Sequence, residues 1–366
     1  MVLFRSVESW HITEKDWLVK VVRFCLIGTG RAGLVHAKNV VWRVPNAQMT
    51  ALCDTNEACL HEVGDQFGVE KRYTDYREVM RDDEVDAVII VTPCHLHSAI
   101  ACAAAEAGKH ILLEKPMALN VNQCRSIIEA VENAGVTLQL AFMRRFDEGF
   151  LRAKTLIDSG ELGRVMVVKS TGRGPGLPPP WIYDLDKSNG ILAEVNSHDF
   201  DSVRWLAGSD ITRVYAEGAN FKCPDAKADY PDFYDNAVVT LRFANGVLGT
   251  IDGTCPCHYG YDARVEVLCE KGVIFIGSAV KSGCTHVKVD NVEVTGVGTG
   301  YTESVWSWRS LFKDAYLAEL EHLIECIEQK KTPKVTGLDG LKAVEAVVAA
   351  NQALRSGQPV DLGGVS

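Results

Sequence analysis

The chain has 366 residues, of which 47% are hydrophobic and 23% are charged, and its formal net charge at pH 7 is −10. This length predicts two domains of ordinary size, and the acidic charge argues against nucleic acid or an anionic membrane as a partner. No apolar run approaches the ~20 residues that a membrane-spanning helix needs. Residues 1–20 lack a long apolar centre and are therefore no secretory signal; an extra N-terminal arm and a non-native start both remain open.

The first predicted strand, Val21 to Ile27, runs directly into a glycine-rich hexapeptide, Gly28-Thr29-Gly30-Arg31-Ala32-Gly33. In a G-x-G-x-x-G turn of this kind the first glycine makes the tight turn, the second lets the backbone approach a diphosphate, and the third lets the following helix pack against the strand. The diphosphate then accepts hydrogen bonds from free N–H groups at the helix start. We therefore predict that this turn binds a dinucleotide, with an ordinary strand-to-helix turn as the alternative.

A second predicted strand, Met49 to Cys53, ends in Asp54, which lies 21 residues after Gly33. An acidic residue at this distance binds the hydroxyl groups of the adenosine ribose and favours NAD over NADP. The sequence therefore predicts NAD as the cofactor.

Strands and helices continue to alternate through residue 141. Helices are predicted at 57–67, 98–107 and 121–134, strands at 85–91, 110–113 and 136–141, and a short strand and helix around 73–80. Such alternation is typical of a doubly wound parallel sheet, which binds its ligand outside the carboxyl ends of the strands. Thr92-Pro93, His97 and Glu114-Lys115 follow two of these ends, so we expect them to face the cofactor.

The second half is predicted to be an antiparallel sheet with helices. Helices are expected at 151–159, 191–206, 311–329 and 340–355, and strands at 165–171, 214–217, 236–243, 247–254, 263–269 and 273–276. Asn245-Gly246 indicates a hairpin turn, and the Gly- and Pro-rich residues 172–186 indicate an ordered loop. The predicted fold is an α/β doubly wound domain over residues 21–142, followed by an α+β domain over residues 143–366.

The twelve cysteines are not spaced as a disulfide framework or a zinc site. Cys255, Cys257 and His258 form the one cluster, and no second ligand pair follows it at zinc-site spacing. We predict no metal and reduced structural thiols, which imply a cytoplasmic protein. A metal at this cluster is the alternative.

Three motifs make the chain recognisable: GTGRAG over residues 28–33, TPCHLH over residues 92–97, and EKP over residues 114–116, which is the most specific. They resemble the Gfo/Idh/MocA family of nicotinamide-dependent sugar and polyol oxidoreductases. Residues 142–147, 260–266 and the tail from 312 to 340 look like its inositol dehydrogenase branch, and the resemblance covers about residues 21 to 362.

The resemblance implies a second domain with a large, mostly antiparallel open sheet, helices on one face and oligomer contacts on the other, and hence a homotetramer. It also implies an enzyme that uses NAD to oxidise a secondary alcohol of a cyclic polyol or sugar, inositol-like, to the ketone. A cis bond before Pro116 would be in keeping with the family.

The predicted catalytic residues are His198, Lys115 and Glu194. Glu194 and His198 are four residues apart, so they share one face of the helix predicted over 191–206. The family places an acid and a histidine in this relation, and the histidine serves the substrate hydroxyl. Here a glutamate stands where the family usually has aspartate, which leaves open whether it orients His198 or reaches the substrate itself.

The chemistry of alcohol oxidation suits two of these side chains. A histidine has a reference pKa of ~6.5, close to working pH, and can act as the base that takes the hydroxyl proton. Lys115, as a cation between substrate and nicotinamide, can stabilise the developing alkoxide.

Further candidates each carry a structural alternative. His97 contacts the cofactor or is a satisfied helix-start histidine, and Arg145, favoured over Arg144, contacts the substrate or pairs with acids. Trp181 and Tyr183 stack on a sugar ring or pin their loop, and Tyr261 is a substrate candidate. The full set of predicted cofactor residues is Gly28, Thr29, Gly30, Arg31, Ala32, Gly33, Asp54, Thr92, Pro93, His97, Glu114 and Lys115.

Two rival functions stay open. The composition of the loop from Gly172 to Trp181 is compatible with a pocket for a glycoside oxidised at its sugar C3 hydroxyl. A non-catalytic regulator that senses a dinucleotide is the other rival, but such relatives tend to lose the EKP lysine or the helix histidine, and this chain keeps both.

Overall fold

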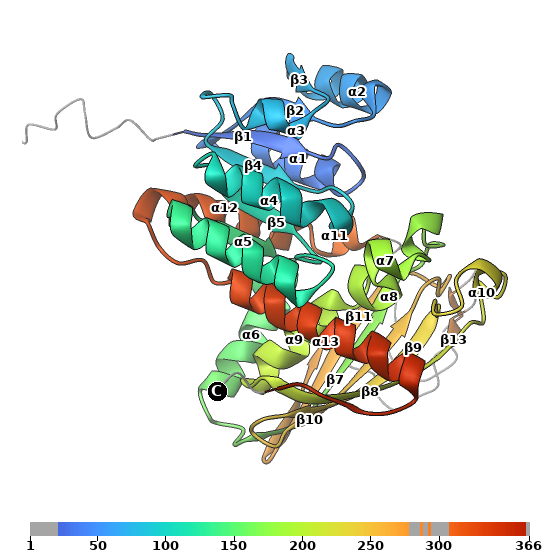
Figure 1. The fold of residues 1–366 in the computed structure, drawn as a ribbon. Helices are drawn as coiled ribbons and strands as arrows, with labels where there is room; N and C mark the ends of the chain where they lie inside the picture. The colour runs from blue at the N-terminus through green and yellow to red at the C-terminus, as the bar shows by residue number, and fades with distance from the viewer. Residues whose placement is uncertain (1–20, 278–285, 288–291, 294–306, 364–366) are drawn as a thin grey trace, which may run out of the picture.

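The computed structural model of the chain describes residues 21–277, 286–287, 292–293 and 307–363 (Figure 1). The N-terminal extension predicted over residues 1–20 lies outside the described residues. Within them the predicted class is confirmed, because the chain forms one parallel sheet followed by one mostly antiparallel sheet.

The first sheet has six parallel strands in the order β3-β2-β1-β4-β5-β6. The strands are β1 Val22–Ile27, β2 Ala47–Cys53, β3 Lys71–Tyr73, β4 Ala87–Ile90, β5 His110–Glu114 and β6 Leu138–Ala141. They alternate with helices α1 Gly33–Trp42, α2 Glu57–Phe67, α3 Tyr76–Val79, α4 His97–Glu106 and α5 Val121–Ala134, and a 3-10 turn, Cys94–Leu96, precedes α4. The strand order reverses between β1 and β4, and a crevice at such a reversal is where doubly wound sheets bind nucleotides.

The second sheet has seven strands in the order β12-β11-β7-β10-β9-β8-β15. They are β7 Val165–Arg173, β8 Ile211–Ala219, β9 Asn236–Phe243, β10 Leu248–Thr254, β11 Asp262–Cys269, β12 Gly272–Ile276 and β15 Val360–Asp361. Among the described strands of this sheet, only β7 and β10 pair in parallel. A separate pair, β13 His286–Val287 and β14 Val292–Glu293, is antiparallel.

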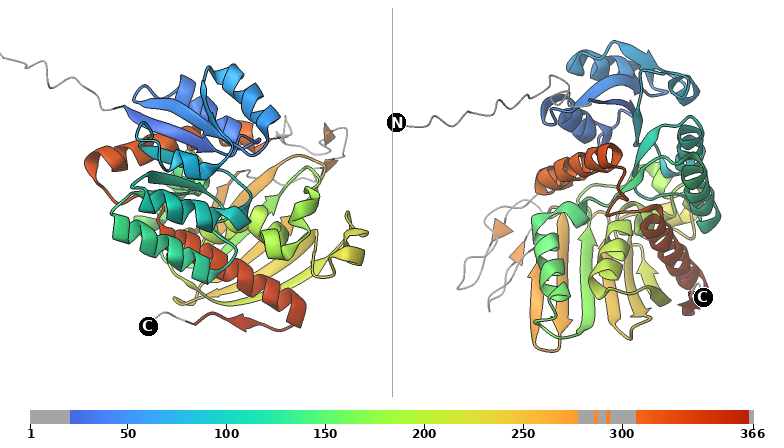
Figure 2. Two further views of the ribbon diagram at one scale, coloured as in Figure 1. Left: turned by 45° about the horizontal axis from the view of Figure 1, so that its top comes forward. Right: turned by 90° about the vertical axis from the view of Figure 1, so that its left-hand side faces the viewer.

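Helices α6 Glu148–Asp158, α9 Ser197–Ala207 and α13 Gly337–Ser356 cover one face of the second sheet (Figures 1 and 2). Shorter helices are α7 Leu185–Ser188, α8 Gly190–Glu194, α10 Ala226–Asp229 and α11 Trp308–Leu311, with 3-10 turns at Met143–Phe146 and Pro180–Ile182. The loop expected over 172–186 is therefore largely irregular, although β7 extends through Arg173, a 3-10 turn interrupts the loop, and α7 begins at Leu185.

A row of five small residues crosses the helix-facing side of the second sheet. The residues are register partners on neighbouring strands: Ala263, Gly172, Gly253, Ala237 and Gly218. Because these side chains are small or missing, backbone and side chains from the covering helices can approach the strands closely at this level.

The single helix predicted over residues 191–206 is wrong, because the chain breaks into α8 and α9 at Val195 and Asn196. The side-chain amide of Asn196 donates to the carbonyl oxygen of Gly172 at 3.0 Å and to Asp199 Oδ2 at 2.9 Å. An asparagine that bonds outside its own helix competes with the regular helical hydrogen bonds. The periodicity of the apolar residues alone did not reveal this break.

Helix α12, Lys313–Gln329, returns from the second half of the chain to the first. Figure 2 shows it between the two sheets. Its Leu320, Leu323 and Ile324 belong to the same buried cluster as residues of β1, β2 and α1. Arg43, which directly follows α1, pairs with Asp314. The apolar packing around the first sheet therefore includes residues beyond position 142.

Candidate active site

The glycine-rich turn has the geometry that a dinucleotide requires. Gly28 has a φ of +104°, and a Cβ added there would lie 2.5 Å from Val91 O; one added to Gly33 would lie 2.2 Å from Gly28 O. Both positions therefore exclude a side chain. At Gly30 an added Cβ would meet no atom within 4 Å, so the loop leaves open space beside it. These residues, with Arg31 and Ala32 at the start of α1, fit a diphosphate.

Asp54 is fixed to this turn. Its Oδ2 accepts hydrogen bonds from the backbone N–H of Thr29 at 2.7 Å and from Thr29 Oγ1 at 2.8 Å, and its Oδ1 accepts from Asn56 N at 2.9 Å. The carboxylate is thus held at the end of β2 beside the turn, where a dinucleotide-binding fold places the acid that meets the adenosine ribose.

His97 connects two strand ends. It is 1% exposed, its Nδ1 lies 2.7 Å from Pro116 O, and its Nε2 lies 2.8 Å from Thr92 O. Burial lowers its pKa, against the effect of the two carbonyl contacts. Both ring nitrogens are engaged by backbone, so the contacts favour the structural alternative. Thr92 and Pro93 remain at the end of β4, and Thr92 Oγ1 is buried without a partner among the described residues.

Glu114 faces inward instead of toward a cofactor. Its Oε1 lies 2.9 Å from His36 Nε2 of α1, and its Oε2 accepts from the backbone N–H of Lys115 at 3.1 Å. Burial would raise its pKa, but His36 and Lys115 hold it below the usual value. Glu114 thus forms a buried link between α1 and Lys115, and its cofactor contact stays a prediction.

Lys115 projects from the end of β5 toward the second half of the chain. Its Nζ donates to the main-chain oxygen of Glu194 at 2.7 Å, and the peptide bond to Pro116 is cis. Because α8 ends at Glu194, that oxygen accepts the lysine. The helix break therefore supplies the partner that orients the Lys115 ammonium.

The carboxyl group of Glu194 stays near Lys115 without a fixed partner. Its Oε1 is buried and has no hydrogen-bond partner among the described residues. Burial raises the pKa of Glu194 to about 7, with Glu114 adding to the rise and Lys115 opposing it. The group can therefore take up or release a proton near neutral pH.

His198 lies in the first turn of α9 and is 4% exposed. Its ring packs edge-on against Phe142 with centroids 5.9 Å apart, and its Nδ1 has no partner in the described part of the chain. Burial, followed by the positive charges of Lys115 and Arg144, lowers its pKa well below the usual value. The imidazole is therefore neutral at pH 7 and able to accept a proton. Glu194 and His198 come from two helices and do not share one helical face.

Four residues that were not predicted as site residues hold the start of α9. Arg144 Nη1 donates to Asp199 Oδ1 at 2.7 Å, and Ser170 Oγ donates to the same oxygen at 2.6 Å. Asn196 bonds to the other carboxylate oxygen. All four side chains are at least 98% buried. Arg144 was considered from sequence as a possible partner of acids, and it pairs with Asp199. Sequence gave no comparable signal for Ser170, Asn196 and Asp199.

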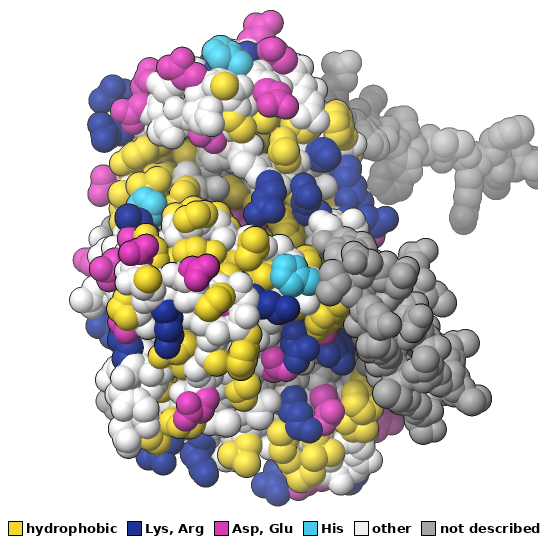
Figure 3. All heavy atoms as spheres, turned by 90° about the vertical axis from the view of Figure 1, so that its right-hand side faces the viewer, with side chains coloured by type: hydrophobic (Ala, Val, Ile, Leu, Met, Phe, Trp, Pro, Cys, Tyr) yellow, Lys and Arg dark blue, Asp and Glu magenta, His cyan; other side chains and the backbone are white. Residues whose placement is uncertain are grey.

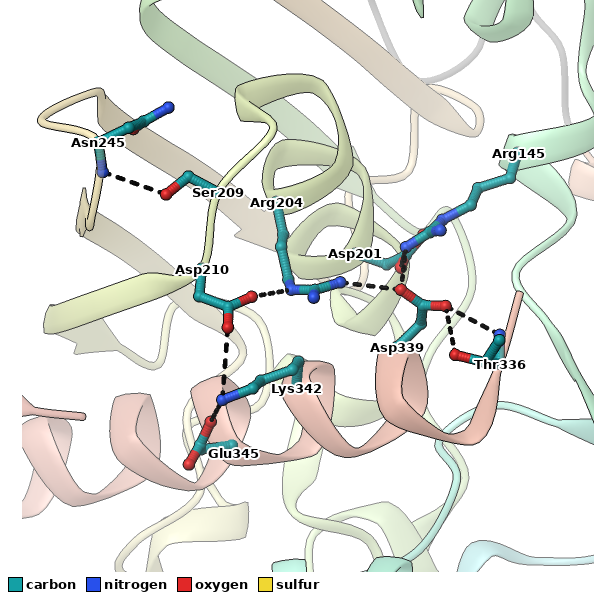
Figure 4. A network of polar contacts seen from close by, with 10 residues as sticks. All are labelled: Arg145, Asp201, Arg204, Ser209, Asp210, Asn245, Thr336, Asp339, Lys342 and Glu345. Atoms are coloured by element: carbon teal, nitrogen blue, oxygen red, sulfur yellow. Dashed lines mark hydrogen bonds and ion pairs between the residues drawn. The ribbon is translucent and has the colours of Figure 1, made fainter. Parts of the chain in front are cut away.

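Arg145 lies in a network of ion pairs and hydrogen bonds (Figure 4). Its guanidinium donates to both oxygens of Asp201, at 2.9 and 2.6 Å, and to Asp339 Oδ1 at 2.9 Å. Arg204 joins the same Asp339 oxygen at 2.8 Å. Nε and Nη2 of Arg145 are thus bonded to acids, in keeping with the alternative considered from sequence, and its substrate contact stays a prediction.

The aromatic residues of the Gly- and Pro-rich loop pin that loop. The ring of Tyr183 lies 4.6 Å from that of Phe233, and its hydroxyl donates to Cys223 Sγ at 3.8 Å. Trp181 is half-buried against the same apolar cluster. Stacking of Tyr183 on a sugar ring finds no support in these contacts.

Tyr261 lies beside the site. Its ring meets Phe312 edge-on at 6.4 Å, and together with Asp199 it raises the pKa of Arg144 against the effect of burial. It therefore remains a candidate for substrate contact.

The cysteine cluster is engaged by backbone. Cys255 Sγ donates to Gly176 O at 3.2 Å, and Cys257 Sγ donates to Gly260 O at 2.9 Å. Across the described ranges, no group of three or more His, Cys, Asp or Glu residues is arranged to hold a metal ion. None of the helices in that part of the chain combines the length and apolar character needed to traverse a bilayer.

The face shown in Figure 3 is recessed between its upper and lower parts, and Lys and Arg side chains gather beside the recess. The chain as a whole carries a net charge of −10, so this local gathering of cations runs against the overall charge. Positive side chains favour an anionic ligand such as a diphosphate.

Two family models match the chain. The oxidoreductase family with an NAD-binding Rossmann fold matches residues 22–142, and the GFO/IDH/MocA C-terminal domain matches residues 150–275.

Known relatives and solved structures agree with these matches. The scyllo-inositol 2-dehydrogenase (NAD(+)) of Bacillus subtilis strain 168 is 36% identical over 341 residues, which cover 93% of this chain and 96% of the relative. The myo-inositol 2-dehydrogenase of Thermotoga maritima is 35% identical over 93% of this chain and 98% of the relative. The crystal structure of myo-inositol 2-dehydrogenase from Lactobacillus plantarum has a TM-score of 0.82 at 27% identity, over 94% of this chain and 100% of that one. The chain therefore belongs to the GFO/IDH/MocA family of oxidoreductases and has its NAD-binding Rossmann fold.

Proposed function

We propose that the protein is an NAD-dependent dehydrogenase that oxidises a ring hydroxyl of an inositol-like cyclic polyol to the ketone. The observation that carries this proposal is the position of Lys115, at a strand end of the cofactor sheet, with its Nζ 2.7 Å from Glu194 O. Burial lowers the pKa of His198, and the charge of the same lysine lowers it further. Two relatives of about this chain's length act on scyllo- and myo-inositol by name.

The chain's own residues perform the acid–base part of the reaction. Residues 28–33 and Asp54 would hold NAD, which would supply the hydride acceptor when bound. His198, neutral at pH 7, accepts the proton of the substrate hydroxyl. Lys115 stabilises the negative charge that develops on the alcohol oxygen. Glu194, whose pKa is about 7, is the second group that can hold the proton.

The direct test measures NADH formation at 340 nm with NAD and, separately, NADP, against a panel of inositols, free sugars and glycosides. We expect turnover of one inositol isomer with NAD and little with NADP. Turnover of a glycoside alone would move the substrate to the C3-type rival. Lys115→Ala should abolish turnover while NAD binding persists, whereas Arg125→Ala, at an exposed position of α5, should change neither. A wild-type chain that binds NAD but oxidises nothing in the panel would overturn the enzyme proposal.

We also propose a homotetramer formed through the uncovered face of the second sheet. On that face an apolar row crosses β10, β7, β11 and β12 in register, through Leu248, Val167, Leu268 and Val273. Leu248 and Val273 are 46% and 44% exposed. Apolar side chains gathered in this way favour a protein contact. Light scattering on the purified protein would give the subunit number.

Two further assignments are proposals of the same kind. Residues 21–142 bind the cofactor, and residues 143–366 supply the substrate pocket and the subunit contacts. A cytoplasmic location is supported by eleven cysteines of the described chain that are all free thiols. Fractionation of the native cells would test the location.

A further inference from the structure

We infer that Asn196 and Asp199, seated against two paired glycines of the second sheet, are positioning residues that hold Glu194 O in place for Lys115. The inference rests on the proposed function, because it concerns the same site. It adds four residues, Asn196, Asp199, Gly172 and Gly253, that act through the backbone and touch no reacting atom.

Gly172 and Gly253 leave the space that the side chains of Asp199 and Asn196 occupy, and we call this space the seat. Gly172 of β7 and Gly253 of β10 are direct register partners. A Cβ on Gly172 would lie 1.9 Å from Asp199 Oδ2, and one on Gly253 would lie 2.2 Å from Asn196 Oδ1. These separations are far below a normal contact, so any side chain at either glycine must push the polar residue away.

The seated side chains fix the break between α8 and α9. Asn196 and Asp199 are both 0% exposed. Asn196 Nδ2 bridges Gly172 O and Asp199 Oδ2, and Asp199 Oδ1 receives Arg144 and Ser170. The segment that contains the break is therefore tied to the strand backbone by side chains that have no room to adopt another position.

The break controls both catalytic elements. Asn196 follows Glu194 by two residues, and His198 follows Asn196 by two residues, so a shift of Asn196 moves both neighbours. Lys115 Nζ donates to the main-chain oxygen of Glu194. The position of this acceptor therefore depends on the backbone at the break and not on the side chain of residue 194. A displacement of about 1 Å at a reacting group costs on the order of a hundredfold in rate. The seat is therefore expected to act on kcat and not on NAD affinity.

The test compares Gly253→Ala with Gly249→Ala, a matched control on the same strand. An added Cβ at Gly249 would lie 2.9 Å from Phe243 Cε2, so this variant introduces a steric clash in the same sheet that does not involve Asn196. On the inositol substrate we expect Gly253→Ala to lower kcat at least about tenfold relative to Gly249→Ala. The affinity for NADH, followed by its fluorescence, should be equal in the two variants. Equal kcat in both would overturn the inference.

A double variant separates positioning from general damage. Asn196→Ala removes the side chain that collides with the new Cβ, so Gly253→Ala/Asn196→Ala should have kcat within about twofold of Asn196→Ala alone, since coupled sites are not additive. Multiplied losses in the double variant would contradict a shared seat.

A crystal structure of Gly253→Ala gives a readout that needs no activity. We expect the separation of Lys115 Nζ and Glu194 O to exceed hydrogen-bond distance in the variant and not in the wild type. An unchanged separation would overturn the inference even if the wild-type enzyme oxidises inositol. A wild type inactive on every polyol would refute the proposed function instead, and the crystal comparison would still decide the positioning role.

Discussion

Lys115 Nζ lies 2.7 Å from the main-chain oxygen of Glu194. A lysine that directly follows β5 of the first sheet is therefore hydrogen-bonded to the break between α8 and α9, in the second half of the chain. The two halves of the chain each supply one side of the site. Because the acceptor is backbone, a substitution of the Glu194 side chain leaves this bond in place. The carboxyl group can therefore be tested separately from the orientation of the lysine.

Glu194→Gln tests whether this carboxyl group carries a proton. Burial and Glu114 raise its pKa to about 7, so the carboxylate form that can accept a proton becomes dominant as pH rises through about 7. We expect wild-type kcat to rise over that interval. The glutamine cannot titrate, so the variant should have a lower kcat without this inflection. A kcat profile from mildly acidic to mildly alkaline pH is the measurement, and an unchanged inflection would assign it to another group.

Asp54→Ala tests the choice of cofactor. The carboxylate accepts two hydrogen bonds from Thr29 and would repel the 2′-phosphate of NADP. Loss of a charged hydrogen-bonding group costs about 1.5–3 kcal/mol, which corresponds to roughly ten- to a hundredfold in kcat/KM for NAD. The ratio of kcat/KM for NAD to that for NADP should fall.

Thr29→Val is the matched control for Asp54→Ala. It removes the hydroxyl bond to Asp54 but keeps the backbone bond and the negative charge. The preference for NAD should persist in this variant. If both variants lost the preference equally, the charge of Asp54 would not be its source.

Arg145→Ala should destabilise the protein strongly. The change leaves Asp201, which is 1% exposed, and Asp339 without this arginine. Removal of one partner of a buried ion pair costs about 3–5 kcal/mol, because a buried charge is left uncompensated. Urea unfolding measures the loss. Arg213→Ala, which breaks an exposed pair with Asp361, should have little effect, and similar losses in both variants would contradict the argument.

Glu319→Gln should change how stability depends on pH. Glu319 is 0% exposed, and neither side-chain oxygen has a partner in the described part of the chain. Burial and Glu114 raise its pKa well above the usual value. The folded protein therefore keeps a proton that the unfolded chain releases, so this group lowers stability progressively as pH rises above the ordinary pKa of a glutamate.

The glutamine variant has no such proton to lose. Its free energy of unfolding relative to wild type should therefore increase from mildly acidic to mildly alkaline pH. Urea unfolding at both ends of that interval is the measurement, and Glu321→Gln, at an exposed position of the same helix, is the control. A difference that stays constant with pH would mean that Glu319 does not keep its proton.

The parts of the fold that depend on neighbouring residues were predictable. The strand that ends at Ile27 and the helices over Glu57–Phe67 and Val121–Ala134 were all predicted from local patterns, and the structure has them. The family and its cofactor were recognisable for the same reason, because GTGRAG and EKP are short contiguous motifs.

The parts that depend on distant partners were not predictable. Arg145 finds Asp339 194 positions away, and nothing near Arg145 distinguishes an ion pair from a substrate contact. Gly172 and Gly253 form the seat for Asn196 and Asp199 only because β7 and β10 pair in this register, which local sequence does not reveal. The break after Glu194 follows from that seat, so helical periodicity over 191–206 predicted one continuous helix.

Helix α12 has a consequence for how the protein can be divided. Leu320, Leu323 and Ile324 complete the apolar packing around β1, β2 and α1. A fragment that stops at residue 142 would expose that surface to water and is expected to aggregate, although it would contain every strand of the first sheet. Chimeras that exchange cofactor specificity with a relative must therefore transfer α12 together with residues 21–142, because the unit that packs as one body is formed by two separate stretches of the sequence.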